Sequence, residues 1–189
     1  MERKRESFEF DPWKCGAPGL TLSNENRTAV APGDGAKGEA RTVLANCALT
    51  KGRYYWEIVV DHCPVGTRSC GTLYVGLATE KVDLSIPLCR KQCIGWYDES
   101  FSDSSRLCVV RPSIPGGTST GQGHRIGIYF DSKTGTFRFF VDKVRVASGS
   151  LDMERGPYFP AVSLYADKMY PKCTVTIDSQ AELPPGVDV

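Results

Sequence analysis

HRIGIYFDSKTGTFRFFV, residues 124–141, is the stretch that decides the fold class of this chain. Large apolar residues alternate with other residues over 126–130, and the same two-residue period returns over 137–141. The break at 131–136 is polar and contains Gly135, which can take a positive φ where the chain reverses. The stretch therefore predicts a β-hairpin.

A second reversal follows at once, because Asp142-Lys143 separates the end of the hairpin from the alternating residues 144–146. Tyr129 and Phe140 fall on the face opposite the row of aliphatic residues. Both faces of this three-stranded meander are thus partly apolar, which suits a central strand pair inside a sandwich.

The rest of the chain repeats short apolar or alternating runs separated by turn residues, and no window shows a convincing helical period. Ten or more short strands without helices between them predict an all-β, antiparallel sandwich or barrel. Besides the meander, we expect strands at residues 7–12, 20–23, 28–30, 42–49, 53–61, 72–78, 93–97, 107–110, 158–165 and 174–177.

The strongest of these strands covers residues 53–61 and is rich in aromatic and β-branched residues. Glu57 falls on one of its faces. The other face is expected to enter the core with Tyr54, Trp56, Ile58 and Val60.

Composition excludes several classes of partner. The 189 residues are 41% hydrophobic and 24% charged, with a formal net charge of +1. This balance gives no reason to expect binding to nucleic acid or to an anionic membrane surface. No apolar run approaches the roughly 20 residues that span a bilayer, and no apolar core follows the charged N-terminus. We expect a soluble, cytoplasmic protein without membrane insertion.

Eight cysteines are scattered along the chain without a repeated short spacing. The closest approaches to a metal-ligand pattern are Cys89 with Cys93, and His62-Cys63 with Cys70, whereas a structural zinc site usually shows two close pairs. We expect reduced thiols and no cofactor, with a metal site or a disulfide as the alternative.

Catalysis finds little support in the residues. His62 and His124 are the only histidines, and no serine stands in a nucleophile-elbow motif. Cys63 follows His62 directly, but adjacent residues of an extended chain point to opposite faces. The carboxylates at 98–103 lie in a polar, turn-like segment. We therefore expect a non-enzymatic domain.

The order and spacing of six segments resemble the PRY/SPRY, or B30.2, domain over about residues 8–177. The family's usual LDP, WEVE and LDYE motifs appear in softened form within the first, third and fifth segments. The six are Phe10-Asp11-Pro12, Leu22-Ser23-Asn24-Glu25-Asn26, Gly52-Arg53-Tyr54-Tyr55-Trp56-Glu57-Ile58, Val75-Gly76-Leu77-Ala78, Arg125-Ile126-Gly127-Ile128-Tyr129-Phe130-Asp131 and Phe159-Pro160-Ala161-Val162-Ser163-Leu164.

This resemblance implies a single domain over 1–189, a bent jelly-roll sandwich of two antiparallel sheets like that of concanavalin. The PRY part would cover about 7–50, the SPRY part about 51–178, and a tail 179–189. The segments are most similar to the C-terminal domain of tripartite-motif (TRIM) ubiquitin ligases, especially the cytoskeletal subgroup that carries a fibronectin type III module.

The resemblance also implies a function. Such a domain binds a peptide or surface loop of a protein partner, here as the substrate-recognition domain of a RING-type E3 ubiquitin ligase. The alternative is an adaptor that targets a cytoskeletal or other scaffold without a ligase role, with the cytoskeleton as its location. A self-associating structural module is a third possibility, because an edge strand can pair with a neighbour. The isolated domain is expected to be monomeric, and its parent chain to dimerise through a coiled coil.

Alignment to the family's variable loops places the partner site in two segments. The first follows the strand at 93–97 and the second follows the strand ending at Leu164. Aromatic rings and an arginine among small polar groups have the composition of an interface hot spot. The expected binding residues are Tyr97, Asp98, Ser100, Phe101, Arg106, Tyr165, Asp167 and Lys168.

Three further features bear on the same surface. In similar domains the tryptophan that corresponds to Trp96 packs between the sheets, so we expect it in the core. Trp13 has two possible roles, since the sequence around it departs from the family pattern: it either covers the end of the sandwich or is exposed for binding. The insertion 61–70 is also unusual for the family and is a candidate to reshape the rim of the site.

Overall fold

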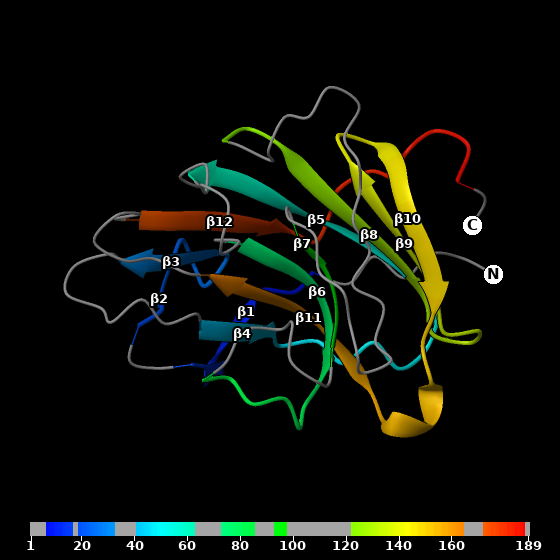
Figure 1. Cartoon of the computed structure of the whole chain (residues 1–189), viewed down its shortest axis with the longest axis horizontal. Coiled ribbons are helices and arrows are strands. Elements are labelled where there is room, and N and C mark those ends of the chain that lie inside the picture. The colour runs from blue at the N-terminus through cyan, green and yellow to red at the C-terminus, as the bar shows by residue number, and fades with distance from the viewer. Residues whose placement is uncertain are drawn as a thin grey trace.

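The computed structural model describes residues 7–16, 19–32, 41–62, 73–85, 93–97, 122–164 and 172–187. In this part of the chain two antiparallel sheets pack face to face (Figure 1), which confirms the all-β sandwich predicted from the sequence. The five-stranded sheet has the order β1 (Phe10–Cys15), β4 (Arg41–Ala45), β11 (Tyr158–Leu164), β6 (Leu73–Thr79) and β7 (Cys93–Tyr97).

The seven-stranded sheet contains the meander from which the fold class was predicted. It has the order β10 (Val144–Ser150), β9 (Thr136–Val141), β8 (Arg125–Asp131), β5 (Arg53–His62), β12 (Lys172–Asp178), β3 (Thr28–Pro32) and β2 (Thr21–Ser23).

The predicted hairpin is confirmed as β8 and β9, with Ile128 opposite Phe139. Gly135 has a φ of 69° in the connecting turn, as its position in the polar break requires. The second reversal is a two-residue turn in which Asp142 and Lys143 both have positive φ, of 49° and 68°. Two successive positive φ values match the right-handed twist of the flanking strands β9 and β10.

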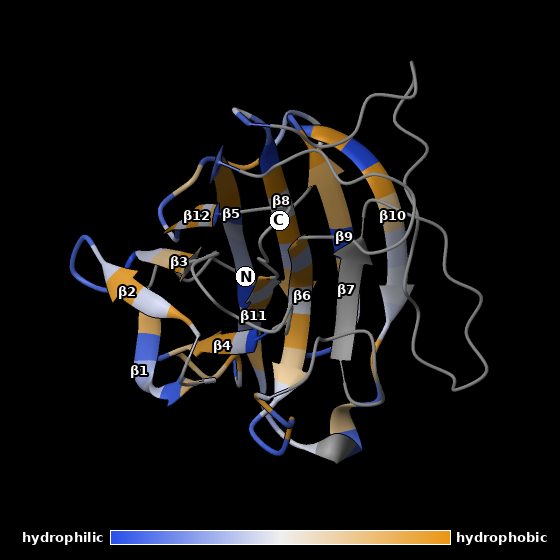
Figure 2. Ribbon diagram, turned by 60° about the vertical axis from the view of Figure 1, so that its left-hand side comes forward, coloured by the Kyte–Doolittle hydropathy of each residue, from blue (hydrophilic) through white to orange (hydrophobic). Residues whose placement is uncertain are grey.

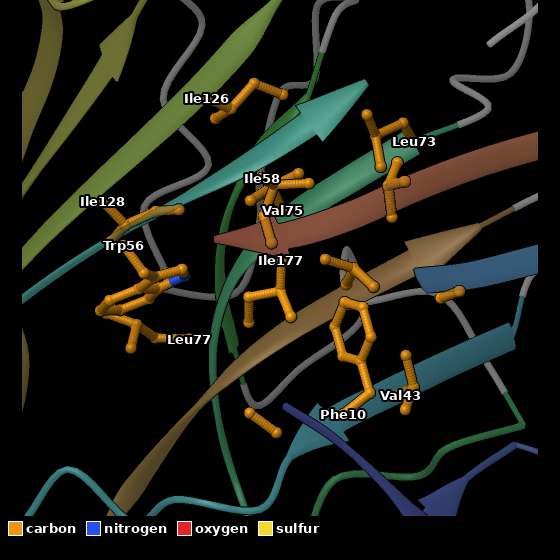
Figure 3. Packing of buried hydrophobic residues seen from close by; sticks show 14 of the residues in the cluster. Phe10, Val43, Trp56, Ile58, Leu73, Val75, Leu77, Ile126, Ile128 and Ile177 are labelled. Carbon is orange, nitrogen blue, oxygen red and sulfur yellow. The ribbon is translucent and has the colours of Figure 1, made fainter. Parts of the chain in front are cut away.

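The main core lies between the sheets (Figure 3). Trp56 and Phe139 are fully buried in it, which confirms the predicted inward face of β5. Phe8 packs edge-on against Trp56, with ring centroids 6.0 Å apart. Figure 3 shows Trp56 of β5 close to Leu77 of β6, so this indole bridges the two sheets.

Each sheet also carries a smaller apolar cluster on its outer face. On the five-stranded sheet, Val82 and Leu84 from the segment after β6 pack with Phe159 and its neighbours. On the seven-stranded sheet, Tyr55, Tyr129 and Phe140 form a cluster with Ala181, and Leu183 and Val187 pack against it. The C-terminal residues 181–187 therefore form part of the folded body, as a strap over the outer face of this sheet.

Three predicted strands have wrong boundaries, and one of them, expected over 42–49, ends at Ala45 as β4. The first strand was expected over 7–12 and to stop at Asp11-Pro12, but β1 begins at Phe10 and continues to Cys15. Pro12 is accommodated because β1 is an edge strand with a register irregularity between Phe10 and Cys15, where a missing N–H costs no ladder bond. The third strand of the meander was expected over 144–146, but β10 continues to Ser150.

A 3-10 helix at Met153–Arg155 (η1) lies in the connection between β10 and β11. It is one turn long and does not alter the fold class. The strand predicted at 107–110 lies outside the described residues. None of the helices in the described ranges has the length and hydrophobicity of a membrane span.

Candidate functional site

The register of the five-stranded sheet brings several strand ends together. Leu164, the last residue of β11, lies opposite Leu73 at the start of β6 and opposite Arg41 at the start of β4. Tyr97, the last residue of β7, lies opposite Tyr74 of β6. The chain therefore leaves β7 and β11 at the same end of the sheet, with only β6 between them.

The seven-stranded sheet has a matching set of strand ends. β12 begins at Lys172, opposite Pro32 at the end of β3. His62 at the end of β5 lies opposite Thr174 of β12, and β8 begins beside the same end of β5. These ends in turn connect, through the chain, to the strand ends just described in the other sheet.

Five connections thus join the two sheets at one end of the sandwich, which we call the loop end: residues 16–20, 33–40, 63–72, 98–124 and 165–171. In Figure 1 the arrowheads of β3, β5 and β11 and the starts of β4 and β12 all lie on the left, which is this end. The opposite end, on the right, is called the turn end.

The predicted binding residues attach to the loop end. Tyr97 is the last residue of β7, and the segments that follow β7 and β11 start at neighbouring strand ends. The topology therefore agrees with one shared surface. The remaining seven residues lie outside the described ranges, and their roles stay predictions: Asp98, Ser100, Phe101, Arg106, Tyr165, Asp167 and Lys168.

The described part of the loop end is built where the chain enters β8 and turns from β9 into β10. The N–H of Gly123 donates to the carbonyl of Val60 at 2.8 Å, and the N–H of Val60 donates to the carbonyl of His124 at 2.9 Å. Nδ1 of His124 lies 2.5 Å from Oδ2 of Asp142. The backbone N–H of Arg125 donates to Oδ1 of the same Asp142 at 2.9 Å.

Beside this junction, on the outer face of the sheet, Glu57 forms the centre of an ionic cluster. Its side chain is 1% exposed. Oε2 accepts a hydrogen bond from Nε of Arg125 at 2.5 Å, and Oε1 lies 2.6 Å from Nζ of Lys143 and accepts from the Tyr55 hydroxyl at 2.6 Å. Nη2 of Arg125 also donates to Oδ2 of Asp178 at 2.5 Å.

The cluster holds Glu57 in its ionised form. Burial acts to raise the pKa of the Glu57 carboxyl, but hydrogen bonds from Lys143, Tyr55 and Arg125 outweigh burial and lower the pKa below its ordinary value. Lys143 also donates to the carbonyl of Glu182 in the strap. One carboxylate therefore ties together β5, the start of β8, the turn at Asp142-Lys143 and, through Lys143, the strap.

Two large apolar side chains of the described residues remain strongly exposed. Trp13 is 92% exposed, so it does not cover the end of the sandwich, and its role in binding stays a prediction. Its backbone N–H donates to Oδ1 of Asp11 at 2.9 Å, in a local turn within β1. Val144, the first residue of β10, is 62% exposed and lies at the loop end.

Sequence reasoning located the turn at Asp142-Lys143 but missed its surroundings. The short polar pair between alternating runs was a sufficient signal for the reversal. No local signal reveals that Lys143 reaches Glu57, because the two residues meet only when β8, β9 and β5 pair. The register places the backbone of Trp96 opposite Val75, a core residue, and its predicted core position stays a prediction.

Metal and thiol chemistry have no organised site in the described ranges. There, no group of three or more His, Cys, Asp or Glu side chains is arranged to hold a metal ion. Cys15 is a free thiol, and burial raises its pKa. His124 is engaged with Asp142 rather than with a nucleophile.

Comparison with known proteins identifies the family. The sequence model of the SPRY domain matches residues 53–179. The chain belongs to the SPRY domain family. SPRY domains are protein-interaction modules and are generally non-catalytic, so the loop end is a candidate protein-binding surface of this one.

A curated relative of this SPRY domain is the E3 ubiquitin-protein ligase TRIM9 of Drosophila melanogaster, 28% identical over 167 residues. The match covers 83% of this chain and 20% of TRIM9, so the chain spans about a fifth of that relative's length.

Solved structures share the fold. The SPRY domain of human HERC1 has a TM-score of 0.66 at 18% identity, covering 92% of this chain and 99% of that one. The TRIM65 PSpry domain has a TM-score of 0.61 at 15% identity, covering 91% and 92%. The relative and these folds support a TRIM-like SPRY domain, as the resemblance of the six segments predicted.

Proposed function

We propose that this SPRY domain is the substrate-recognition domain of a RING-type E3 ubiquitin ligase and that it binds a peptide or surface loop at the loop end. The single observation that carries the proposal is the match to TRIM9, a ubiquitin-protein ligase, over most of this chain. In such a ligase the SPRY domain would hold the substrate, and another part of the protein would recruit the ubiquitin-conjugating enzyme.

The geometry supports the loop end as the binding surface. The segments that flank the sandwich meet at the turn end, where the N–H of Phe8 donates to Oγ of Ser179 at 3.1 Å. Five connections between the sheets gather at the other end. Loops carried by a rigid sandwich are where recognition residues are commonly placed. The loop end therefore lies opposite the end at which β1 begins and β12 ends.

The test is affinity capture with the isolated domain, beside a Tyr97→Ala/Tyr165→Ala double variant. We expect the double variant to bind its partner ~10-fold more weakly or worse, at an unchanged melting temperature, because hot-spot aromatics contribute about 1.4 kcal/mol or more each. The matched control is Lys51→Ala/Lys133→Ala, two exposed residues at the turn end, which should bind like the wild type.

The ligase part of the proposal needs a separate readout. For each partner lost in the double variant, ubiquitination by the full-length protein should fall when the same two tyrosines are replaced. Partners that bind through the loops but are never ubiquitinated would contradict the ligase role and leave an adaptor. Partners that the double variant retains would move the binding site away from these loops.

A further inference from the structure

The exposed Val144 and its neighbour mark a part of the loop end that is fully described. Val144 and Arg145 open β10, and both side chains are exposed. Figure 2 shows the start of β10 changing from hydrophobic to hydrophilic and back over successive residues. Val144 is thus one of two large apolar side chains strongly exposed in the described ranges, and it stands next to a cation on an edge strand.

The turn that presents this pair is held rigidly. Its two residues occupy the left-handed region, and the N–H of Asp142 donates to the carbonyl of Arg125 at 2.9 Å. Nζ of Lys143 lies 2.6 Å from the buried carboxylate of Glu57. A partner that binds beside Val144 and Arg145 would therefore lose little backbone conformational entropy in ordering this segment.

Among the described residues, Arg145 has no counter-ion, unlike the other cations of this corner. Arg125 is paired with Glu57 and Asp178, and Lys143 with Glu57. Within the described ranges, no carboxylate forms an ion pair with Arg145. Its guanidinium is free to accept a carboxylate in the two-pronged geometry that arginine favours.

The position of the pair on the sheet restricts the shape of the partner. β10 is the outermost strand of the seven-stranded sheet, and its pairing with β9 is irregular between Arg145 and Ala147. Such a bulge disfavours long edge-to-edge pairing and leaves only the first residues of the strand as an edge. Adjacent residues of a strand point to opposite faces, and an extended peptide beside the strand alternates in the same way.

We propose that Val144 and Arg145 form an edge site for an extended peptide in which an apolar residue stands next to an aspartate or glutamate. The apolar side chain covers Val144 on one face of the sheet, and the carboxylate pairs with Arg145 on the other. This inference rests on the proposed function and adds a partner chemistry to it, as a short form of strand addition at a sheet edge.

The test uses the 189-residue chain and a displayed library of random short peptides, with counter-selection against Arg145→Glu. Selected peptides should carry an acidic residue beside an apolar one. A synthetic copy of a selected peptide should bind Arg145→Glu at least ~10-fold more weakly and Val144→Ser several-fold more weakly. Lys133→Glu makes the same charge change in an exposed residue of the turn end and should bind like the wild type.

The decisive experiment exchanges the charges of the peptide and of residue 145. A peptide whose acidic residue is replaced by lysine should lose affinity for the wild type and regain it with Arg145→Glu. The wild-type interaction should also weaken as salt is raised, because the Arg145 side chain is exposed to solvent.

The outcomes separate the two proposals. Peptides that ignore Val144 and Arg145 but are lost in Tyr97→Ala/Tyr165→Ala overturn the edge site and leave the loop-end proposal standing. Peptides lost in Arg145→Glu and rescued by charge exchange establish the edge site, whatever the two tyrosines contribute. Failure to select any binding peptide overturns the edge site, while capture of a folded partner by the loops would still support the proposed function.

Discussion

The two ends of this sandwich differ in how the chain crosses them. At the turn end, compact turns such as 24–27 and 132–135 stay within one sheet and are tied to their neighbours. The hydroxyl of Ser132 donates to the carbonyl of Gly52 at 3.0 Å, and the N–H of Leu151 donates to the carbonyl of Gly135 at 2.9 Å. At the loop end, five connections pass from one sheet to the other, whereas at the turn end the connections 46–52 and 151–157 do so.

The proposed function assigns recognition to the loop end, and the bonded turns assign a stabilising role to the turn end. Bonds among turns at one end reinforce the body without presenting new surface. At the other end, the buried carboxylate of Glu57 binds Arg125 at the start of β8 and Lys143 in the turn into β10. These contacts, with the hydrogen bond from the N–H of Arg125 to Asp142, fix both segments. Substitutions in the body and the turn end should therefore change stability, and substitutions on the surface of the loop end should change binding.

The largest expected effect is in the core between the sheets. Trp56→Ala should lower the free energy of unfolding by about 3–5 kcal/mol, because it empties a fully buried position. Urea unfolding measures this loss, and Trp13→Ala is the control. Trp13 is 92% exposed, so its replacement should change stability by no more than about 0.5 kcal/mol. Equal losses in the two variants would show that the assignment of core and surface is wrong.

Next in size is the ionic cluster. Glu57→Gln removes the charge that Arg125 and Lys143 share and should cost about 2 kcal/mol, less than for a fully buried pair because both cations are partly exposed to solvent. The loss should be accompanied by faster hydrogen exchange at the amides of Arg125 and Asp142. Unchanged exchange there, with normal exchange elsewhere, would contradict the role of Glu57 in fixing this corner.

A pair of glycine substitutions compares the two ends directly. Gly135→Ala should cost about 2 kcal/mol, because φ is 69° and a Cβ there would lie 2.4 Å from the carbonyl oxygen of Leu151. Gly123→Ala should cost about 1 kcal/mol, since φ is 96° but nothing lies within 4 Å of the added atom. Thermal unfolding of both variants gives the comparison. A larger loss at Gly123 would reverse the contrast between a packed turn end and an open loop end.

The smallest effect is on the pH dependence. The pKa of Glu57 is lower in the folded domain than the roughly 4.3 of an unfolded chain, so the folded state is favoured by its ionisation. That contribution is complete above about pH 5 and is lost as the pH falls through the folded pKa. Wild-type stability should thus decline more steeply with acid than that of Glu57→Gln. If the wild type and Glu57→Gln lost the same free energy of unfolding between pH 6 and acidic pH, the lowered pKa of Glu57 would be contradicted.

The structural features that could be predicted from sequence are those that depend on local chemistry. The period of two from Ile126 to Val141, with Gly135 at the break, defines a hairpin whatever surrounds it. The end of β1 was misplaced because a proline ends a strand only where its missing N–H would have donated to a neighbouring strand, which is not so at Pro12. Whether a strand is an edge strand depends on the whole sheet.

The site was less predictable than the fold. Turn chemistry located Asp142-Lys143, but the ionic cluster around Glu57 draws Arg125 from the start of β8, Lys143 from the turn into β10 and, through Arg125, Asp178 from the end of β12. Only the pairing of those strands brings them together. The docking of the strap through Ala181 and Leu183 has the same origin, because a short polar and proline-rich tail carries no period that would indicate packing.

The measurement that tests the central claim most directly is a hydrogen-exchange footprint of the domain with a captured partner. We predict protection at the loop end, at amides of residues 123–125 and 142–145 and at Tyr97, with exchange unchanged in the turns at 24–27 and 132–135. Protection confined to the turn end, with no change at the loop end, would contradict the assignment of recognition to that end.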